Sequence, residues 1–449
     1  MTKKVAGGDE IALFYEYLRF SSISADPAQA SVMQSCAEWM SLLLQKWGMQ
    51  VEIHTTKGAP IIFARSEHQQ GKPTLLLYGH YDVQPAEPLN LWLSPPFEPE
   101  IREGMIYARG ATDNKGQTFS HLLGLRELLV HGTLPVNVLV LLDGEEEIGS
   151  PNMKEYLEEH QEALSCDAIL ISDTSMIAPG KPALTLGFRG IACFDVIVQG
   201  PRADLHSGIF GGAASNPALA LSKVLSRMIT EDGGVAIPRF YEGCLPVPAQ
   251  ELESWQRLPW DEAWFEKATG IAPRGGERNC SVLERVWGRP TAEINGITSG
   301  YQGNGSKTII PSSASAKLSC RLVPGQDSEA IAALVKDWIE KELEKEGVTG
   351  MVIYDHGGEP FYTSPDNAFI QVAIAVTENL FGMPPALTRE GLSIPAAVML
   401  QKILQVPVIM LGLGLPDCQA HAPNESYPLA HLDLGAAFFQ KFTAEIATM

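Results

Sequence analysis

In the stretch TLLLYGHYDVQP, residues 74–85, side chains that can bind metals come directly after a strand-like apolar run. A continuous apolar run such as residues 74–78 suits a strand that is buried on both faces, as in a parallel sheet. His80 and Asp82 follow this run two residues apart, so an extended backbone points both side chains to the same side. Asp82 is then expected to orient the His80 imidazole from the side that faces away from a bound metal ion. The stretch therefore predicts a metal site at the end of a buried strand.

Three later apolar runs also precede acidic or imidazole side chains. They are residues 136–142 before Asp143 and the triplet Glu145, Glu146 and Glu147, residues 168–172 before Asp173, and residues 406–411 before His421. Open parallel sheets form their sites outside the carboxyl ends of the strands, so we expect these side chains to converge on one crevice. This convergence indicates a metal-dependent hydrolase.

The residue types are those that hold two divalent ions. Five carboxylate and imidazole ligands that share one bridging carboxylate can hold two ions about 3.5–4 Å apart. The turn RGATDNKG, residues 109–116, presents Asp113 between glycines, where the backbone can approach a metal closely. Within the glutamate triplet, neighbouring side chains face different ways, so one can bind metal while the next handles a proton. Such a site suits zinc and also manganese or cobalt, and the sequence does not choose among them.

The secondary-structure pattern changes near residues 187–190. Before them, strands alternate with helices, which predicts an α/β fold with a mostly parallel sheet. After them, the pattern predicts a smaller antiparallel α+β unit of about residues 191–360. Its expected elements are strands around 192–198, 315–323 and 351–354 and a long acidic helix at 327–346. We therefore predict a discontinuous first domain, residues 1–190 and 361–449, with the second domain inserted into it.

The length of the chain indicates how many domains it has, and its charge excludes some classes of partner. A chain of 449 residues exceeds what one hydrophobic core usually serves, which agrees with more than one domain. Its formal net charge of −20 would repel phosphate backbones and anionic membranes, and no basic stripe offsets it. We expect no nucleic acid and no membrane among its partners, since no run of about 18 apolar residues is present either.

The beginning of the sequence and the cysteines predict a cytoplasmic protein. Residues 1–10 contain two lysines but no apolar segment of the kind found in secretory signals. The seven cysteines are an odd, scattered set without C-x-x-C spacing. Reduced thiols in a cytosol are the simplest interpretation.

Eight motifs occur in an order that resembles the M20 metallopeptidase family, in particular its carnosinase-like and cytosolic nonspecific dipeptidases. They are GHYDVQP (79–85), WLSPPFEP (92–99), RGATDNKG (109–116), DGEEEIGS (143–150), DLHSG (204–208), KLSCRLVP (317–324), REGLSIP (389–395) and AHAPNE (420–425). The matching region covers most of the chain. Any one motif is modest, but the ordered set is highly specific.

The resemblance implies particular roles for the residues of these motifs. The implied ligands of two metal ions are His80, Asp113, Glu147, Asp173 and His421, with Asp113 as the bridge. The glutamate before the metal-binding one is the family's general base, and this position corresponds to Glu146. Residues 148–150 set this register, because the family's glutamate pair is followed by x-G-S. Glu145 is then left as a carboxylate that does not bind metal.

The resemblance also implies roles for residues of the inserted domain. That domain would be a lid and dimerisation domain, and its His206 would reach the active site of a partner subunit in a homodimer. Thr308, Arg321 and Ser393 resemble substrate contacts. Asp82, Glu146 and His206 are thus the expected catalytic residues, and His206 is expected to contact the substrate as well.

The expected reaction is metal-assisted hydrolysis of the amide bond in dipeptides or short peptides. Glu146 would take a proton from water and pass it to the leaving amine, while His206 would stabilise the oxyanion. Two alternatives use the same metals: an N-acyl-amino-acid deacylase and a carboxypeptidase. A noncatalytic metal-binding scaffold is a further alternative, although it has no need for the free carboxylate of Glu146. The side-chain preference and the role of residues 230–289 stay open at this stage.

Overall fold

The computed structural model describes residues 7–391 and 394–449. The chain divides into two compact units. Unit 1 consists of Met1–Leu186, Thr363–Thr388 and Ile394–Met449, and unit 2 of Gly187–Tyr362 and Arg389–Ser393. The seven cysteines all lie in described residues, and all are free thiols. None of the described helices has the length and apolarity that crossing a membrane requires.

Unit 1 contains a six-stranded sheet in the order β1-β2-β6-β3-β7-β17. Its strands are β1 (Gln50–His54), β2 (Ile61–Arg65), β6 (Asn137–Asp143), β3 (Thr74–His80), β7 (Ala168–Ile171) and β17 (Val408–Met410). The last four strands of that order run parallel, whereas β1 and β2 form an antiparallel edge. The sheet is mostly parallel, which confirms the predicted α/β class. Every residue of β6 and β7 is buried, as their continuous apolar runs predict.

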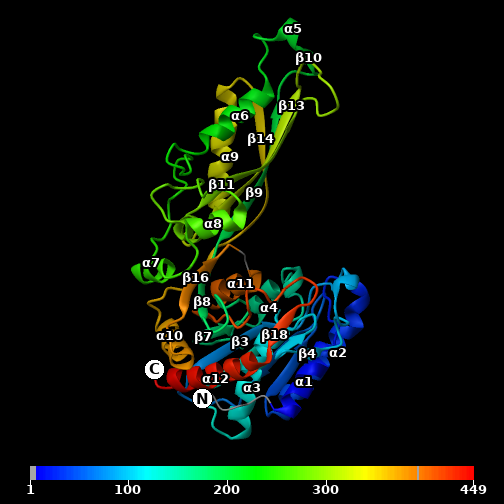
Figure 1. Ribbon diagram of the computed structural model, residues 1–449, viewed down its shortest axis with the longest axis vertical. Coiled ribbons are helices and arrows are strands. Elements are labelled where there is room, and N and C mark those ends of the chain that lie inside the picture. Colours follow the sequence, from blue (N-terminus) through cyan, green and yellow to red (C-terminus); the bar gives the residue numbers. More distant parts are fainter. Residues whose placement is uncertain (1–6, 392–393) are drawn as a thin grey trace. The chain divides into compact units, whose positions relative to one another are not determined.

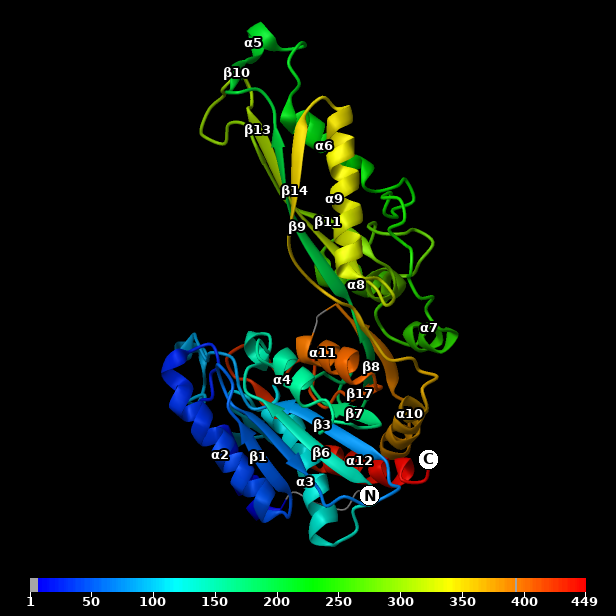
Figure 2. The ribbon, with the colours of Figure 1, turned by 180° about the vertical axis from the view of Figure 1, so that it is seen from behind.

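Helices cover the sheet of unit 1. They are α1 (Gly8–Leu18), α2 (Ala30–Lys46), α3 (Lys115–Val130), α4 (Met153–Glu159), α10 (Ala368–Phe381), α11 (Pro395–Leu404) and α12 (Leu429–Ile446). The pair α3 and α12 lies side by side beneath the sheet in Figure 1, and α3 also contacts β3. Figure 2 shows α2 beside β1, where it buries apolar side chains spaced three and four residues apart.

Short elements complete unit 1 and the chain segments that leave it. The 3₁₀ helices are η1 (Pro27–Gln29), η2 (Leu89–Leu91) and η3 (Glu146–Ile148). A small antiparallel sheet contains β4 (Glu100–Arg102), β5 (Met105–Tyr107) and β18 (Ser426–Pro428). A further three-stranded sheet contains β8 (Ala183–Phe188), β15 (Phe361–Tyr362) and β16 (Ala386–Glu390), and in it β15 pairs antiparallel with β8.

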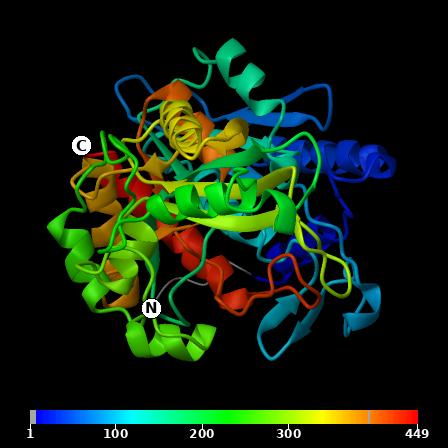
Figure 3. The same ribbon diagram turned by 90° about the horizontal axis from the view of Figure 1, so that it is seen from above.

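Unit 2 is built on an antiparallel four-stranded sheet in the order β11-β13-β9-β14. Its strands are β9 (Gly190–Gln199), β11 (Thr291–Ser299), β13 (Ser313–Leu322) and β14 (Thr349–Gly358), with β10 (Leu205–His206) and β12 (Ile309–Ile310) paired separately. Its helices are α5 (Ser207–Phe210), α6 (Pro217–Arg227), α7 (Ala249–Gln256), α8 (Glu262–Thr269), α9 (Ser328–Lys345) and the π-helical turn η4 (Glu284–Gly288). Figure 3 shows α9 lying against one face of the sheet.

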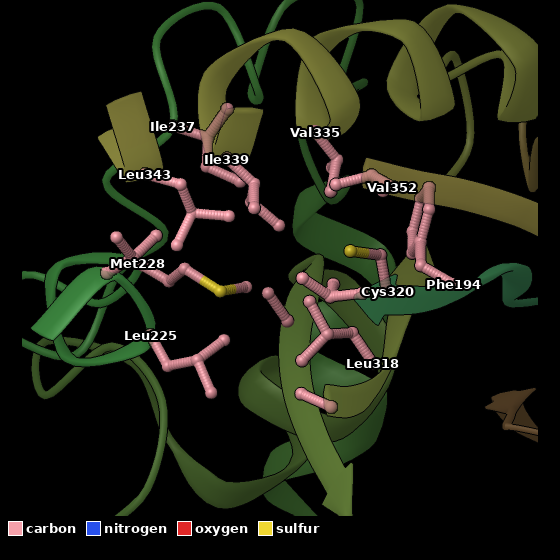
Figure 4. Packing of buried hydrophobic residues seen from close by; sticks show 14 of the residues in the cluster. Phe194, Leu225, Met228, Ile237, Leu318, Cys320, Val335, Ile339, Leu343 and Val352 are labelled. Atoms are coloured by element: carbon pink, nitrogen blue, oxygen red, sulfur yellow. The ribbon is translucent and has the colours of Figure 1, made fainter. Parts of the chain in front are cut away.

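The core of unit 2 follows from alternation along its strands. Every second residue of β9 and β13 is buried, and these side chains meet apolar side chains of α6 and α9. Figure 4 shows part of this cluster, in which Leu318 and Cys320 of β13 lie near Val335 and Ile339 of α9. The residues that alternate with them are half-buried or exposed.

Two elements of unit 2 differ in length from the sequence expectation. The helix predicted at 327–346 begins at Ser328, because Asp327 is its N-cap and accepts a hydrogen bond from the Ala330 amide. The strand predicted at 351–354 is wrong in length, since β14 has ten residues. Backbone pairing with β9, which continues past a bulge at Tyr354, sustains β14 where its side chains are exposed and polar.

Candidate metal centre

The parallel sheet of unit 1 brings the predicted ligands to one edge. His80 is the last residue of β3, and the register pairs it with Asp143 at the end of β6. Glu146 and Glu147 follow in η3, and Asp173 lies two residues beyond β7. Because neighbouring parallel strands end at the same edge, side chains far apart in the sequence meet there.

Two further ligand candidates come from loops. Asp113 lies in the turn before α3, and His421 lies in the connection between β17 and β18. His421 has a positive φ of 60°, a conformation that is uncommon outside glycine and costs about 1–2 kcal/mol. Its surroundings must therefore hold it there, which is frequent at functional sites.

Asp113 lies between two groups of potential ligands. Its Oδ1 is 3.2 Å from His80 Nε2, which is 3.8 Å from Asp173 Oδ2. Its Oδ2 is 2.9 Å from His421 Nε2, which in turn is 3.2 Å from Glu147 Oε2. His80, Asp113 and Asp173 form one group suited to a metal ion, and Asp113, Glu147 and His421 form a second. One carboxylate that contributes to both groups has the geometry of a bridge between two ions.

Two buried atoms without hydrogen-bond partners and an excess of carboxylates indicate that cations fit at this site. His80 Nε2 and Glu147 Oε1 are buried and make no hydrogen bond within the described residues. Besides two imidazoles, the site contains five carboxylates, those of Asp82, Asp113, Glu146, Glu147 and Asp173. Two divalent ions would offset most of this negative charge, and imidazole with carboxylate is a donor set for zinc or manganese.

The titration of these groups reflects their crowding. Burial raises the pKa of Glu146 well above its usual value, and the charges of Asp173, Asp113 and Asp82 add to the effect. Burial also raises the pKa of Asp173 and of Glu147. Asp113 and Glu147 raise the pKa of His421 to about 10, because they stabilise its protonated form. Positive charge nearby would favour the ionised forms of Glu146, Glu147 and Asp173.

Asp82 connects the first imidazole to the glutamate turn. Its Oδ1 is 3.2 Å from His80 Nδ1, so the opposite nitrogen, Nε2, faces Asp113. Its two oxygens also accept hydrogen bonds from the amides of Glu146 and Glu147, at 3.2 and 3.0 Å. The buried Asp82 therefore sets both the orientation of the candidate ligand His80 and the position of η3.

The glutamates of the triplet point to different places. Glu146 Oε2 lies 4.0 Å from His80 Nε2, and Glu147 Oε2 contacts His421. Glu145 Oε2 instead accepts a hydrogen bond from Asn152 Nδ2 at 2.5 Å, away from both imidazoles. This geometry agrees with the register in which Glu147 is a ligand and Glu146 is free for proton transfer.

Three polar residues that we did not single out from the sequence support the candidate ligands. Asn114 Nδ2 donates to Asp173 Oδ1 at 2.8 Å, and Gln84 Nε2 donates to Glu147 Oε2 at 2.8 Å. Glu425 is fully buried and accepts hydrogen bonds from Arg109 Nη1 and from the amides of Gly110, Thr112 and Asp113. All three lie inside motifs recognised in the sequence, but a motif does not reveal which of its members bind metal and which hold the backbone.

The predicted substrate contacts lie in unit 2, at two separate places. The structure brings His206 and Thr308 together, because the Ser207 amide donates to the Thr308 carbonyl and both side chains are exposed. They adjoin the Ser313 end of β13, where Asp204 accepts from Ser312. Arg321 lies eight residues further along this strand, about 26 Å away at roughly 3.3 Å per residue. Ser393 lies outside the described residues.

The comparisons with known proteins agree with this geometry. Residues 76–445 match the peptidase family M20/M25/M40. The chain belongs to this family. It is 30% identical to the Cys-Gly metallodipeptidase of Schizosaccharomyces pombe over 95% of this chain and 93% of that protein. It is also 30% identical to the human Beta-Ala-His dipeptidase, over 87% of this chain and 78% of the relative.

A solved structure supports the same assignment. The M20 family metallo-carboxypeptidase of Sulfolobus solfataricus superposes with a TM-score of 0.77 at 30% identity, and the match covers 99% of this chain and all of that one. The chain shares the fold of this solved relative and carries a side-chain cluster suited to two metals.

Proposed function

We propose that this protein hydrolyses the amide bond of dipeptides or short peptides with two divalent metal ions. The observation that carries the proposal is Asp113, whose two oxygens face two separate imidazole-carboxylate groups while Glu146 stays beside them. The relatives that are dipeptidases for Cys-Gly and Beta-Ala-His support a dipeptide as the substrate.

The residues divide the chemistry between them. His80, Asp113, Glu147, Asp173 and His421 would hold the ions, which when bound would polarise the scissile carbonyl and acidify water. Glu146 takes the proton of the attacking water and delivers it to the leaving amine. Its buried, carboxylate-rich surroundings raise its proton affinity, which suits a group that must accept a proton and release it again. Asp82 keeps the His80 imidazole and the Glu146 backbone in place.

The working unit is a homodimer in which His206 acts on the partner's substrate. The separation of about 26 Å between the His206 end of β13 and Arg321 supports this, because one dipeptide cannot reach both in the same chain. His206 then stabilises the oxyanion and Thr308 contacts the substrate, while Arg321 and Ser393 bind it from the other subunit. Residues 1–190 and 361–449 form the catalytic domain and 191–360 the lid and dimerisation domain of a cytoplasmic enzyme.

Mixing two inactive variants tests the dimer. A mixed dimer of His206→Ala and Glu146→Gln chains contains one site with both an intact Glu146 and an intact His206. We expect activity to return to about one site per mixed dimer. Absence of recovery, with subunit exchange confirmed by differently tagged chains, would contradict delivery from the partner.

The reaction class is tested with a panel of substrates. Purified protein loaded with Zn²⁺, Mn²⁺ or Co²⁺ is assayed on dipeptides, on N-acyl-amino acids and on longer peptides with free carboxyl ends. We expect dipeptides to be the best substrates. Faster cleavage of acyl-amino acids would identify a deacylase, and release of single residues from long peptides would identify a carboxypeptidase, which the similarity to the Sulfolobus enzyme makes the second candidate.

A further inference from the structure

Asp143 is a buried carboxylate of unit 1 that has no part in the proposed reaction. It is the last residue of β6 and is only 2% exposed. Burying a carboxylate costs free energy unless its oxygens are hydrogen-bonded, so its partners show what it stabilises. Within the described residues its oxygens accept three hydrogen bonds, and two of the donors belong to the turn that contains the glutamate triplet.

These two donors lie at opposite ends of the turn. The Glu145 amide donates to Asp143 Oδ1 at 3.0 Å, and the Ser150 hydroxyl donates to Asp143 Oδ2 at 2.6 Å. The Ser150 amide also donates to the Glu145 carbonyl, at 2.8 Å. One carboxylate thus closes residues 143–150 into a loop around Glu146. We call the hydrogen bonds of Asp143 to Glu145 and Ser150 the Asp143 clasp.

The backbone of Ser150 indicates why a serine ends the turn. Ser150 has a positive φ of 51°, which is uncommon for residues other than glycine. Glycine would adopt this conformation without strain, but it has no side chain to bind Asp143. The hydrogen bond from the buried Ser150 hydroxyl to Asp143 is therefore the contribution that glycine would lack.

A second buried carboxylate holds the middle of the same turn. Asp82 accepts hydrogen bonds from the two amides at its centre, whereas Asp143 holds its two ends. The third donor to Asp143 is the Tyr78 hydroxyl, which reaches Oδ2 at 3.3 Å from β3, the strand that ends in His80. The turn is therefore tied at its centre, at its ends and to a strand that carries a candidate ligand.

We propose that Asp143 and Ser150 are positioning residues that fix Glu146 where it takes the proton of the attacking water. The inference rests on the proposed peptidase function and adds to it two residues that act through the base. Glu146 Oε2 lies 4.0 Å from His80 Nε2, so the turn places the base directly beside a candidate ligand. A misplacement of about 1 Å can lower a catalytic rate about 100-fold, so a loop that fixes the backbone of the base controls turnover.

Ser150→Gly tests the clasp with little effect on the backbone. The variant removes the hydroxyl, while glycine adopts the positive φ readily. On the dipeptide that is cleaved fastest, we expect kcat to fall about 10- to 100-fold. KM should change by less than about twofold, because neither residue of the clasp binds substrate. Metal content equal to that of the wild type, measured at saturating metal, shows that the loss is not due to empty sites.

Two variants of Asp143 separate geometry from charge. In Asp143→Asn the amide oxygen can still accept from the Glu145 amide. Its NH₂ group can donate to the hydroxyl oxygens of Ser150 and Tyr78, since a hydroxyl both donates and accepts. We therefore expect Asp143→Asn to retain most of kcat, and Asp143→Ala to lose at least as much as Ser150→Gly. An asparagine variant as inactive as the alanine variant would overturn a clasp that acts through geometry.

A double variant tests whether the clasp acts through Glu146. In a Glu146→Gln background the base is already absent, so Ser150→Gly should cause little further loss of kcat. Residues that act as a unit show this lack of additivity. If the two losses instead multiply, Ser150 acts on another step, and the inference is overturned.

Amide hydrogen exchange tests the clasp without reference to activity. Peptides that cover residues 143–150 should exchange faster in Ser150→Gly and in Asp143→Ala than in the wild type. Thr443→Ala is the control, because its hydroxyl is also buried and donates to the Phe439 carbonyl at 2.8 Å within α12. It should leave both kcat and the exchange of this turn unchanged.

The outcomes distinguish the inference from the function on which it rests. Wild-type kcat in Ser150→Gly would overturn the inference, whether or not the turn exchanges faster, because the clasp would then hold the fold and not the base. Unchanged exchange in Ser150→Gly and Asp143→Ala would overturn it as well, since the turn would not depend on the clasp. Wild-type protein that cleaves no dipeptide would instead contradict the proposed function itself.

Discussion

The candidate residues of unit 1 and those of unit 2 differ in what holds them. In unit 1, Asp113 and Glu147 are fixed through backbone amides that donate to the buried carboxylates of Glu425 and Asp82. In unit 2, His206 ends the two-residue strand β10, Thr308 precedes the two-residue strand β12, and both residues are exposed. The candidate metal centre is thus preorganised within one chain by buried hydrogen bonds, whereas the pair in unit 2 is exposed.

The largest expected effect concerns Glu146 in unit 1. Glu146→Gln keeps the size of the side chain but removes the base, so turnover should fall about 10²–10⁴-fold. Steady-state rates on a dipeptide measure this. Glu145→Gln is the matched control, because Glu145 points to Asn152, and it should cost far less. Equal losses for the two variants would show that the assignment within the triplet is wrong.

The next prediction compares two buried carboxylates, one in each unit. Glu425 pairs with Arg109 at 2.7 Å, and Glu251 pairs with Arg389 at 2.7 and 2.8 Å, and both carboxylates are fully buried. Replacing either with glutamine leaves an uncompensated buried charge, so the free energy of unfolding should fall by about 3–5 kcal/mol. Denaturant titration measures it.

Metal affinity should separate the same two variants. Only Glu425 holds the turn that carries Asp113, so Glu425→Gln should bind metal more weakly while Glu251→Gln binds it normally. Unchanged metal affinity in Glu425→Gln would limit that residue to a role in folding.

The smallest expected effect is a pH dependence of unit 1. Burial lowers the pKa of His121 to about 4, and its ring lies 2.7 Å from Ser172 Oγ and 3.2 Å from the Gly435 carbonyl. Between pH 6.5 and 4 the unfolded chain binds a proton at this residue that the folded chain does not. Stability contributed by neutral His121 is therefore complete above about pH 6.5 and is lost as the pH falls towards 4.

The corresponding variant isolates this contribution. In metal-free protein, His121→Gln should lose part of the acid sensitivity, about 1–3 kcal/mol of unfolding free energy across that range. Denaturant titrations at pH 7, 6 and 5 measure the slope. A variant with the wild-type slope would show that His121 does not contribute to it.

The sequence predicted the parts of unit 1 in which chemistry follows a buried strand. The apolar runs of β3, β6 and β7 indicate a parallel sheet, and His80, Glu147 and Asp173 follow them directly. Glu425 and Asn114 escaped notice because a residue that holds backbone has the same appearance in the sequence as one that binds metal. Their role depends on distances between chain segments that only the fold creates.

The sequence predicted less of the structure of unit 2, for a related reason. The length of β14 depends on backbone pairing with β9, which side-chain patterns at an exposed strand do not record. The meeting of Arg189 and Arg321 at Gly391 joins three distant segments, so no local motif predicts it. Motif recognition identified Arg321 but not its neighbour.

The measurement that tests the central claim most directly is the metal content of three purified proteins, determined by mass spectrometry of the elements after equilibration with Mn²⁺ or Zn²⁺. The account predicts about two ions per chain in the wild type, two in Glu146→Gln, and a loss of both sites in Asp113→Ala, because one carboxylate serves both ligand groups. One ion per wild-type chain, or two ions retained in Asp113→Ala, would contradict a centre bridged by Asp113.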